Sequence, residues 1–193
     1  MSMMIFGENG TGKEHIAHHL HDKSKRAGKP FVAVDCGSLS RELAPSAFFG
    51  HVKGAFTGAD STKKGYFHEA EGGTLFLDEV GNLALETQQM LLRAIQERRY
   101  RTVGDKSDRS FNVRIIAATN EDLEAAVSEK RFRQDLLYRL QDFVITVPPL
   151  RDCQEDIMPL AEFFREIANK ELECSVSGFS SEARKALLTH PWP

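Results

Sequence analysis

A glycine-rich stretch near the start of the chain, Gly7–Lys13, carries residues that could bind phosphate. It reads Gly-Glu-Asn-Gly-Thr-Gly-Lys, follows a short apolar run and precedes a helical pattern, which is the setting that a phosphate-binding loop requires. Glycines let the backbone wrap closely, so the N–H groups from Gly10 to Lys13 can point at phosphate oxygens. The N-terminus of the helix adds its positive dipole end. Lys13 would neutralise the β- and γ-phosphates of a nucleotide.

The position after the loop lysine departs from the general motif. The motif places Ser or Thr there, whose hydroxyl binds magnesium, whereas this chain has Glu14. The alternative interpretation is a glycine-rich turn that binds nothing, which we disfavour because a strand and a helix flank the loop. The predicted nucleotide-binding residues are Gly7, Glu8, Asn9, Gly10, Thr11, Gly12, Lys13 and Glu14.

Two acids, Asp78 and Glu79, end a buried apolar run that starts at Thr74. In an open parallel sheet, ligands bind at the carboxyl ends of the strands, so both carboxylates are expected beside the phosphate loop. Asp78 would hold the shell of a magnesium ion through water, and Glu79 would orient and activate an attacking water. Alone, such a pair could simply begin a solvated loop. Together with the phosphate loop upstream, it indicates nucleotide hydrolysis.

These residues need a scaffold in which strands and helices alternate. Buried strands are predicted from apolar runs at 3–6, 30–34, 74–77, 113–118 and 143–147, and helices from apolar spacing at 13–21 and 85–95. Continuous apolar strands that alternate with helices indicate a parallel sheet covered on both faces. Asn120 is predicted to cap a helix that begins near Glu121.

The character of the sequence changes after Pro149. Apolar residues recur at helical spacing from Ile157 to Ala168, and Ser180 or Ser181 can cap a second helix through Leu188. No strand is predicted in this part. We therefore predict an α/β nucleotide-binding subdomain over residues 1–149 and a helical subdomain over residues 150–193.

The composition indicates a globular chain. Of 193 residues, 41% are hydrophobic and 27% are charged, which excludes a wholly disordered protein. Lys and Arg total 25 against 28 Asp and Glu, and a net charge of -3 argues against a dedicated nucleic-acid-binding domain. No apolar run approaches the roughly 20 residues of a membrane span. Because no signal-peptide pattern and no disulfide framework are visible, we expect a reduced, cytoplasmic protein.

Six motifs in one order resemble those of the bacterial enhancer-binding proteins, the NtrC-like AAA+ activators of sigma-54 RNA polymerase. Gly54-Ala55-Phe56-Thr57-Gly58-Ala59 resembles their signature loop, and Phe49-Gly50-His51 leads into it as in the family. The phosphate loop with its Glu14, the acidic strand end, Ala118-Thr119-Asn120 and Val147-Pro148-Pro149-Leu150-Arg151 are also similar to family motifs. The resemblance covers essentially the whole chain. It implies a P-loop AAA+ fold, a three-layer α/β sandwich with a central parallel sheet, followed by a small helical lid.

The resemblance assigns roles to further residues. Asn120 is similar to the sensor residue that reads the γ-phosphate. The segment 132–139 resembles the one that supplies arginine fingers to a neighbouring subunit. Arg133 and Arg139 would then be the fingers, and hydrolysis would need a ring of subunits, expected from the family to be a hexamer. Such a finger is worth about 10³–10⁵ in rate. Without the resemblance, both would be surface arginines that pair with Asp135 or water.

The signature loop has a physical logic of its own. An exposed aromatic such as Phe56 on a glycine-hinged loop is costly unless it meets a partner. In the family this loop rises with the nucleotide state and grips sigma-54. The expected partner-binding residues are therefore Gly54, Ala55, Phe56, Thr57, Gly58 and Ala59, with Phe56 and Thr57 at the contact. The stretch from Arg101 to Asn112 resembles a second mobile loop that moves with it, and a plain solvated turn is an equal alternative.

One residue departs from the family pattern. Val34-Asp35-Cys36 stands where the family has Val-Asn-Cys, whose Asn holds back the catalytic Glu until the partner is engaged. An ionised Asp35 cannot donate a hydrogen bond, and it would repel Glu79. Our hypothesis is that Asp35 still acts on Glu79.

The resemblance implies ATP and Mg²⁺ as cofactors, and coupling of ATP hydrolysis to remodelling of the sigma-54 RNA polymerase. Two alternatives stay open: a nucleotide-gated binding module that scarcely hydrolyses, and an AAA+ ATPase that acts on another substrate. The family's lid continues beyond Pro193, and its adenine-enclosing segment lies ahead of the phosphate loop. We therefore expect a fragment that binds nucleotide weakly, with any DNA-binding domain outside it.

Overall fold

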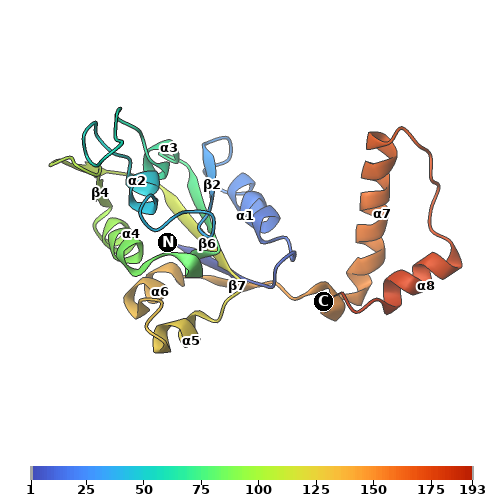
Figure 1. Ribbon diagram of the computed structural model, residues 1–193. Coiled ribbons are helices and arrows are strands. Elements are labelled where there is room, and N and C mark those ends of the chain that lie inside the picture. The colour runs from blue at the N-terminus through green and yellow to red at the C-terminus, as the bar shows by residue number, and fades with distance from the viewer. Residues whose placement is uncertain (1, 193) are drawn as a thin grey trace. The chain divides into compact units, whose positions relative to one another are not determined.

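A computed structural model describes residues 2–192. Its centre is one five-stranded parallel sheet with the strand order β2-β3-β6-β1-β7, which confirms the predicted parallel sheet (Figure 1). The strands are β1 (Met3–Phe6), β2 (Phe31–Asp35), β3 (Thr74–Asp78), β6 (Arg114–Thr119) and β7 (Val144–Thr146).

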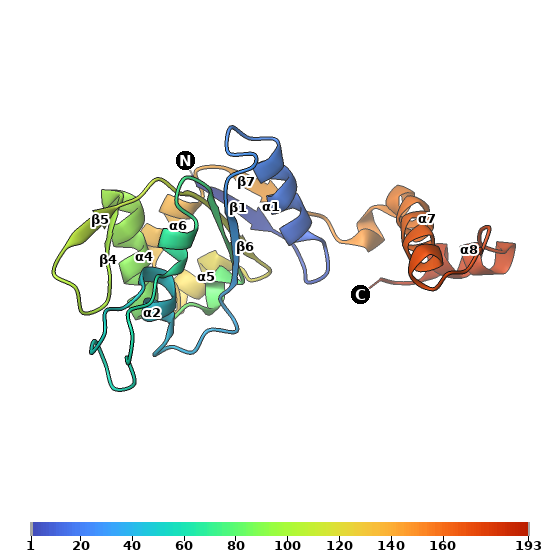
Figure 2. The ribbon, with the colours of Figure 1, turned by 90° about the horizontal axis from the view of Figure 1, so that it is seen from above.

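Helices cover both faces of this sheet. One face carries α1 (Lys13–Asp22), and Figures 1 and 2 show α4 and α6 on the other side. The helices after α1 in this part are α2 (Ala44–Phe49), α3 (Tyr66–Glu69), α4 (Leu85–Glu97), α5 (Leu123–Ser128) and α6 (Gln134–Leu140). A short 3₁₀ helix, η1 (Val80–Asn82), follows β3, and an antiparallel hairpin of β4 (Arg99–Arg101) and β5 (Asp108–Ser110) follows α4.

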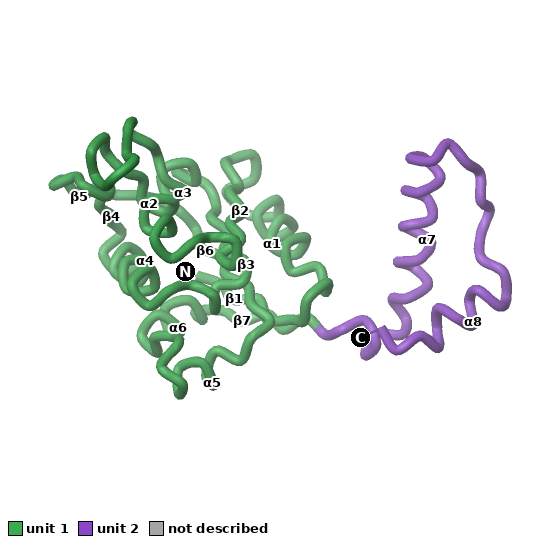
Figure 3. The backbone as a smooth tube through the Cα atoms, viewed as in Figure 1, with its two compact units in different colours: residues 1–147 green, residues 148–193 purple. Residues whose placement is uncertain are grey.

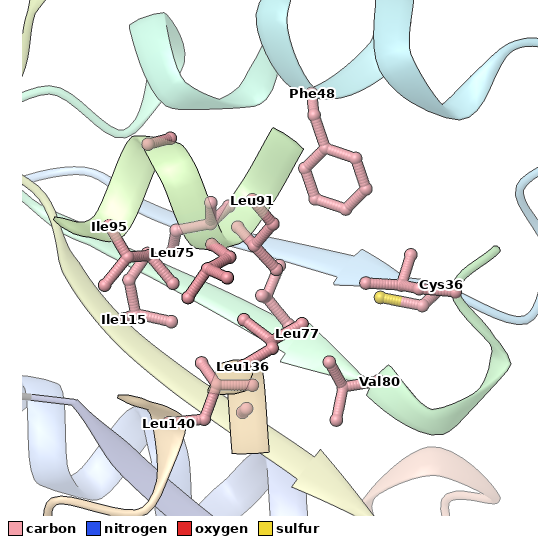
Figure 4. Packing of buried hydrophobic residues seen from close by; sticks show 14 of the residues in the cluster. Cys36, Phe48, Leu75, Leu77, Val80, Leu91, Ile95, Ile115, Leu136 and Leu140 are labelled. Carbon is pink, nitrogen blue, oxygen red and sulfur yellow. The ribbon is translucent and has the colours of Figure 1, made fainter. Parts of the chain in front are cut away.

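Successive side chains of a strand point to opposite faces of the sheet, so the buried residues form two clusters, one on each face. Leu75, Leu77 and Ile115 pack with residues of α4 and α6 (Figure 4), whereas Phe76 and Ile116 pack with α1. All five side chains are at most 2% exposed. Burying each one contributes about 1.5–3 kcal/mol, so the central strands are held from both sides. This burial explains why they read as continuous apolar runs rather than alternating ones.

The chain divides into two compact units, Met1–Val147 and Pro148–Pro193 (Figure 3). The second unit contains η2 (Leu150–Asp152), α7 (Gln154–Glu171) and α8 (Ser181–Thr189). Ser180 caps α8, since its side chain accepts a hydrogen bond from the Ala183 N–H at 3.2 Å. Among residues 2–192, no helix combines the length and the apolar character that a membrane span needs.

The predicted helix cap at Asn120 is wrong. Helix α5 begins two residues later than expected, and Asp122 caps it by accepting the N–H groups of Glu124 and Ala125 at 2.9 and 3.0 Å. Asp is as good a cap as Asn, and here it is the one placed at the start of the helix. Asn120 is thereby left exposed just beyond the end of β6.

Candidate active site

The parallel sheet brings the carboxyl ends of its strands together at one side. We call this side, with the phosphate loop, Asp35, Asp78, Glu79 and Asn120, the catalytic edge. In the strand register, Phe6 of β1 lies opposite Thr119 of β6, and Asp35 of β2 lies opposite Asp78 of β3. The Gly7 N–H donates to the Thr119 carbonyl at 3.2 Å. The phosphate loop, Asn120, Asp78 and Glu79 therefore follow neighbouring strands of one sheet, as the sequence predicts.

The phosphate loop has the backbone of an anion-binding turn. Gly10 and Gly12 have left-handed φ values of 79° and 80°, which glycine adopts without strain. A side-chain carbon at Gly7 would lie 2.7 Å from Thr11 Oγ1, so this position has no room for a larger residue. The glycines thus form a tight turn that leads directly into the N-terminus of α1.

Lys13 lies inside this turn. It is only 7% exposed, and its Nζ donates to the carbonyl oxygens of Gly7 at 2.9 Å and Glu8 at 3.0 Å. The hydroxyl of Thr11 also donates to the Glu8 carbonyl, at 2.8 Å. The ammonium group is therefore held over the loop before any phosphate arrives. Glu14 is exposed in the first turn of α1.

The residues at this edge fit a magnesium ion that arrives with a nucleotide. Within residues 2–192, His, Cys, Asp and Glu form no group of three that could hold a metal ion by themselves. Mg²⁺ commonly keeps several waters and binds one or two carboxylates together with substrate phosphates. Asp78, half-buried at the end of β3, has a carboxylate suited to this, and its Oδ1 also accepts the Glu79 N–H at 3.0 Å.

Glu79 is held in an uncommon conformation. Its φ of 51° and ψ of 44° are left-handed, which is rare for a residue other than Gly, Asn or Asp. Asn82 donates from Nδ2 to Glu79 Oε2 at 2.8 Å, and the Asn82 N–H donates to the Glu79 carbonyl at 2.9 Å. Asn82 is a site residue that the sequence reasoning missed. The available signal was an amide three residues after the acid.

Asp35 lies beside Glu79. Its Oδ1 accepts the Gly37 N–H at 2.8 Å. A side-chain carbon at Gly37 would lie 2.5 Å from Glu79 Oε2 and 3.2 Å from Asp35 Oδ1, so the two carboxylates flank the same small space. That Asp35 acts on Glu79 stays a prediction, since its carboxylate is bound by the backbone and Asn82 binds Glu79.

Cys36 lies behind these acids, in the core. It is 2% exposed and appears with the core residues in Figure 4. Burial raises the pKa of the Cys36 thiol well above its ordinary value, and the nearby carboxylates of Asp35, Asp78 and Glu79 raise it further. The thiol therefore stays protonated.

The two candidate arginine fingers lie at opposite ends of α6. Arg133 precedes the helix and forms a two-point ion pair with Asp135, with Nε to Oδ1 at 3.0 Å and Nη2 to Oδ2 at 2.8 Å. The hydrogen bond from Arg133 lowers the pKa of the Asp135 carboxyl, and the same bond raises the pKa of Arg133. Arg139 lies in the last turn and is exposed. The Arg133 side chain is thus partly exposed to solvent, and Arg139 is exposed.

The Gly54–Ala59 loop is a tight reversal of the chain. The Gly54 N–H donates to the Ala59 carbonyl at 2.8 Å, and Gly54 and Gly58 have φ values of 81° and 95°. Phe56 is 39% exposed and meets the His51 ring edge to face, with 5.0 Å between centroids. Ala59 is buried, so the exposed part of the loop is Gly54 and Phe56–Gly58.

The segment from Arg101 to Asn112 forms most of the β4–β5 hairpin, and this hairpin contacts the Gly54–Ala59 loop. Val52 and Val103 are joined by a hydrogen bond from the Val52 N–H to the Val103 carbonyl, at 3.1 Å. At the tip, a side-chain carbon on Gly104 would lie 2.8 Å from the Ala55 Cβ. The hairpin also carries an ion pair between Arg101 and Asp108 at 2.8 Å. The Gly54–Ala59 loop therefore lies against this hairpin.

The sheet order, the phosphate loop after β1 and the acidic end of β3 together define a P-loop AAA+ domain. Solved structures agree with this class. NtrX from Brucella abortus in complex with ATP matches with a TM-score of 0.91 at 34% identity, over 99% of this chain and 41% of that one. Hsp104 matches with a TM-score of 0.63 over 89% of this chain, and at 20% identity this shows the fold alone.

Sequence comparison gives the family. The family model described as "Sigma-54 interaction domain" matches residues 1–146, and the chain belongs to this family. It is 50% identical over 192 residues to the alginate biosynthesis transcriptional regulatory protein AlgB of Pseudomonas putida, covering 43% of that protein. It is 47% identical to the DNA-binding transcriptional regulator NtrC of Rhizobium meliloti, covering 40% of it.

A third relative is the sigma54-dependent transcriptional activator SfnR of Pseudomonas putida, 47% identical over 192 residues. The chain covers 52% of that protein. These matches confirm the resemblance inferred from the six motifs. The chain spans between two fifths and about half the length of these relatives.

Proposed function

We propose that this chain is the ATP-hydrolysing domain of a sigma-54-dependent transcriptional regulator. It would couple hydrolysis to remodelling of the sigma-54 RNA polymerase closed complex through the Gly54–Ala59 loop. The observation that carries the proposal is the meeting of Lys13, Asp78 and Glu79 at one sheet edge, in a chain that also presents this loop. Any contact with DNA would belong to parts of the full-length protein outside these 193 residues.

At the catalytic edge, each residue has a separate task. The backbone of Gly7–Glu14 would enclose the phosphates, and Lys13 would exchange its bonds to loop carbonyls for bonds to the β- and γ-phosphate oxygens. Asp78 would hold a magnesium ion through water, and that ion would supply positive charge to the phosphates. Glu79 would orient the attacking water and accept its proton. Asn120, exposed beside the loop, would contact the γ-phosphate.

Arg133 and Arg139 would complete the site of a neighbouring subunit in a ring, expected to be a hexamer. The support is that both lie on the surface, at the two ends of α6. Arg133 would exchange Asp135 for the γ-phosphate of the neighbour, so one anion replaces another beside the same cation. A finger of this kind is worth about 10³–10⁵ in rate.

The Gly54–Ala59 loop would carry the mechanical output. The Phe56 ring contacts His51 and is 39% exposed, so docking on sigma-54 would bury apolar surface that is now exposed. The β4–β5 hairpin supports the loop through Gly104 and Val103, so movement of the hairpin would move the loop.

A second candidate, a nucleotide-gated binding module with little hydrolysis, is favoured by one observation. Asn82 binds the carboxylate of Glu79 that would otherwise activate water. This contact supports slow ATP turnover by a subunit that has no partner bound. The two candidates differ in whether the full-length protein releases phosphate at a rate that depends on Glu79.

The test combines phosphate release with retention of sigma-54 by the full-length protein in the presence of ADP and aluminium fluoride, a transition-state mimic. We expect the wild type to hydrolyse ATP and to retain sigma-54. Phe56→Ala should hydrolyse ATP within about threefold of wild type and lose retention, because it removes the exposed aromatic surface of the loop and leaves every residue of the catalytic edge unchanged. Phe143→Ala, which alters another exposed aromatic, is the matched control and should retain sigma-54. The proposal would be contradicted if Phe56→Ala retained sigma-54 as well as the wild type does, or if the wild type released no phosphate.

A further inference from the structure

A buried glutamine in α4 bonds both to the turn that holds Glu79 and to the segment that carries Arg133. Gln88 is 0% exposed, and its side-chain amide makes three hydrogen bonds to backbone groups. Its Nε2 donates to the Leu83 carbonyl at 2.7 Å and to the Arg131 carbonyl at 2.9 Å. Its Oε1 accepts the Arg133 N–H at 2.9 Å. The last two partners are 43 and 45 residues away in the sequence.

The first partner of Gln88 lies at the end of the turn that holds Glu79. That turn runs from Glu79 through η1, and the Leu83 N–H closes it by donating to the Val80 carbonyl at 3.3 Å. Asn82, next to Leu83, binds the Glu79 carboxylate. Gln88 is therefore fastened to the segment that positions the water-activating acid.

The other two partners, Arg131 and Arg133, lie on either side of Phe132, the first residue of the segment 132–139 that carries the candidate arginine fingers. Phe132, between them, is 3% exposed and packs in the core. The Arg131 guanidinium is bound by Glu121 and by Glu129, at 2.5 and 2.7 Å. With the backbone on either side of Phe132 held by Gln88, the segment is fixed up to Arg133. Beyond this point the Arg133 side chain is 36% exposed, and its guanidinium pairs with Asp135.

We propose that Gln88 is a positioning residue for Arg133. By fixing the backbone N–H of Arg133 and the carbonyl of Arg131, it sets the direction in which the guanidinium leaves the subunit. This inference rests on the proposed function, in which Arg133 acts on the nucleotide of a neighbour. A finger must reach the developing charge within a fraction of an ångström, and a misplacement of about 1 Å can reduce the rate by 10²-fold.

The amide is the group that this place requires. Two donors and one acceptor are used, and Gln supplies both from one planar group. Gln88→Glu keeps the acceptor for the Arg133 N–H and removes both donors, so two buried carbonyls would face a carboxylate. Gln88→Met keeps the length and removes all three bonds. Gln89, the next residue of the same helix, is exposed, so Gln89→Glu is the matched control for the charge change.

The first measurement separates positioning from substrate binding in the full-length protein. We expect Gln88→Glu and Gln88→Met to lower kcat by about 10- to 100-fold while KM for ATP stays within about twofold, because the subunit's own phosphate loop is untouched. Gln89→Glu should match the wild type in both constants. A rise in KM with kcat unchanged would overturn the proposal. Loss of the folded state in both Gln88 variants would also overturn it, because Gln88 would then be a general structural tie.

The second measurement uses mixed rings, because a finger acts on another subunit's nucleotide. Lys13→Ala removes a subunit's own site and leaves its finger, whereas Arg133→Ala removes the finger and leaves the site. Mixing these two reference variants should restore phosphate release that neither shows alone. If Gln88 positions the finger, Gln88→Glu should regain activity when mixed with Lys13→Ala and not when mixed with Arg133→Ala.

The outcomes of the mixing experiment are distinct. If the two reference variants complement each other and Gln88→Glu is rescued by Arg133→Ala instead, Gln88 acts on its own subunit's site and the positioning role is wrong. If the reference variants fail to complement each other while the wild type hydrolyses ATP, the role of Arg133 as an arginine finger is wrong. That second result contradicts the proposed function, and the role of Gln88 falls with it.

Discussion

The catalytic edge and the Gly54–Ala59 loop both depend on glycines, and they differ in what surrounds the backbone. At the edge, Gly7 has no room for a side chain, and Lys13 and Glu79 are bound by named partners. In the loop, a side-chain carbon at Gly54 or Gly58 would meet nothing within 4 Å. Gly7 is thus needed for close packing, whereas Gly54 and Gly58, like Gly10 and Gly12 of the phosphate loop, are needed for their left-handed backbone. Chemistry requires fixed geometry, and a segment that moves must have few contacts to break.

The largest expected effect would separate the two regions most clearly. Glu79→Gln removes the proton acceptor while keeping the shape and the contact with Asn82. We expect kcat for phosphate release to fall by about 10²–10⁴-fold, with ATP affinity unchanged. Glu69→Gln, an exposed acid on α3, is the control and should leave kcat as it is. Turnover by Glu79→Gln within threefold of wild type would mean that the edge does not carry the chemistry.

The next effect concerns the support of the loop. Gly104 has a φ of 81°, and an alanine there would place its Cβ 2.8 Å from the Ala55 Cβ. We expect Gly104→Ala to reduce retention of sigma-54 by at least about 10-fold, while phosphate release stays within about threefold of wild type. Backbone strain alone is about 1–3 kcal/mol.

The control for that variant is Gly28→Ala. Gly28 has a similar φ of 73° with nothing within 4 Å, so the substitution imposes the strain without the clash. Equal loss of retention in both variants would show that strain, rather than contact with the loop, is responsible.

The sequence predicts the elements that are buried on both faces. It does not predict features that depend on a choice between similar residues or on short exposed strands. Val113–Ala118 and Thr74–Leu77 read as strands because they are buried on both faces, and the shared edge then follows from parallel pairing. The cap at Asn120 is wrong because Asp122, equally suited, lies nearer the start of α5. The β4–β5 hairpin was missed because its short strands carry exposed charges.

The candidate site divides in the same way. Lys13, Asp78 and Glu79 were predictable, since their motif and strand ends place them at one edge. Asn82 and Gln88 were not, because each acts through hydrogen bonds whose partners depend on the folded chain. Nothing in the sequence distinguishes Gln88 from the exposed Gln89 except one position of helical phase.

A smaller effect is expected where the edge is restrained by one contact. Asn82→Ala removes the donor that binds Glu79 Oε2. We expect ATP turnover without sigma-54 to rise about threefold to tenfold, equivalent to one lost hydrogen bond of about 0.5–1.5 kcal/mol. Asp35→Asn should act in the opposite direction, because it offers Glu79 a second amide donor. Unchanged turnover in both variants, with and without sigma-54, would remove the proposed restraint.

The smallest effect tests how completely the polar groups near the edge are partnered. Thr87 Oγ1, next to Gln88, is buried and has no hydrogen-bond partner among the described residues. Thr87→Val should raise the free energy of unfolding by about 1 kcal/mol, or Tm by about 2–4 °C. The control is Thr74→Val, which removes a buried hydroxyl that is 2.9 Å from His21 Nδ1 and should destabilise the protein. Destabilisation by both substitutions would indicate that Thr87 has a partner.

The acids around Cys36 also affect how the domain responds to oxidants. Thiol oxidation and alkylation proceed through the thiolate, and burial and three carboxylates keep the Cys36 sulfur in the thiol form. Peroxide or maleimide should therefore reach the exposed Cys174 in the second unit long before Cys36. Burial first, and then the same negative charges that are proposed to serve hydrolysis, thus keep the Cys36 sulfur unreactive. A fluorophore can be attached at Cys174 without chemical damage to the catalytic edge.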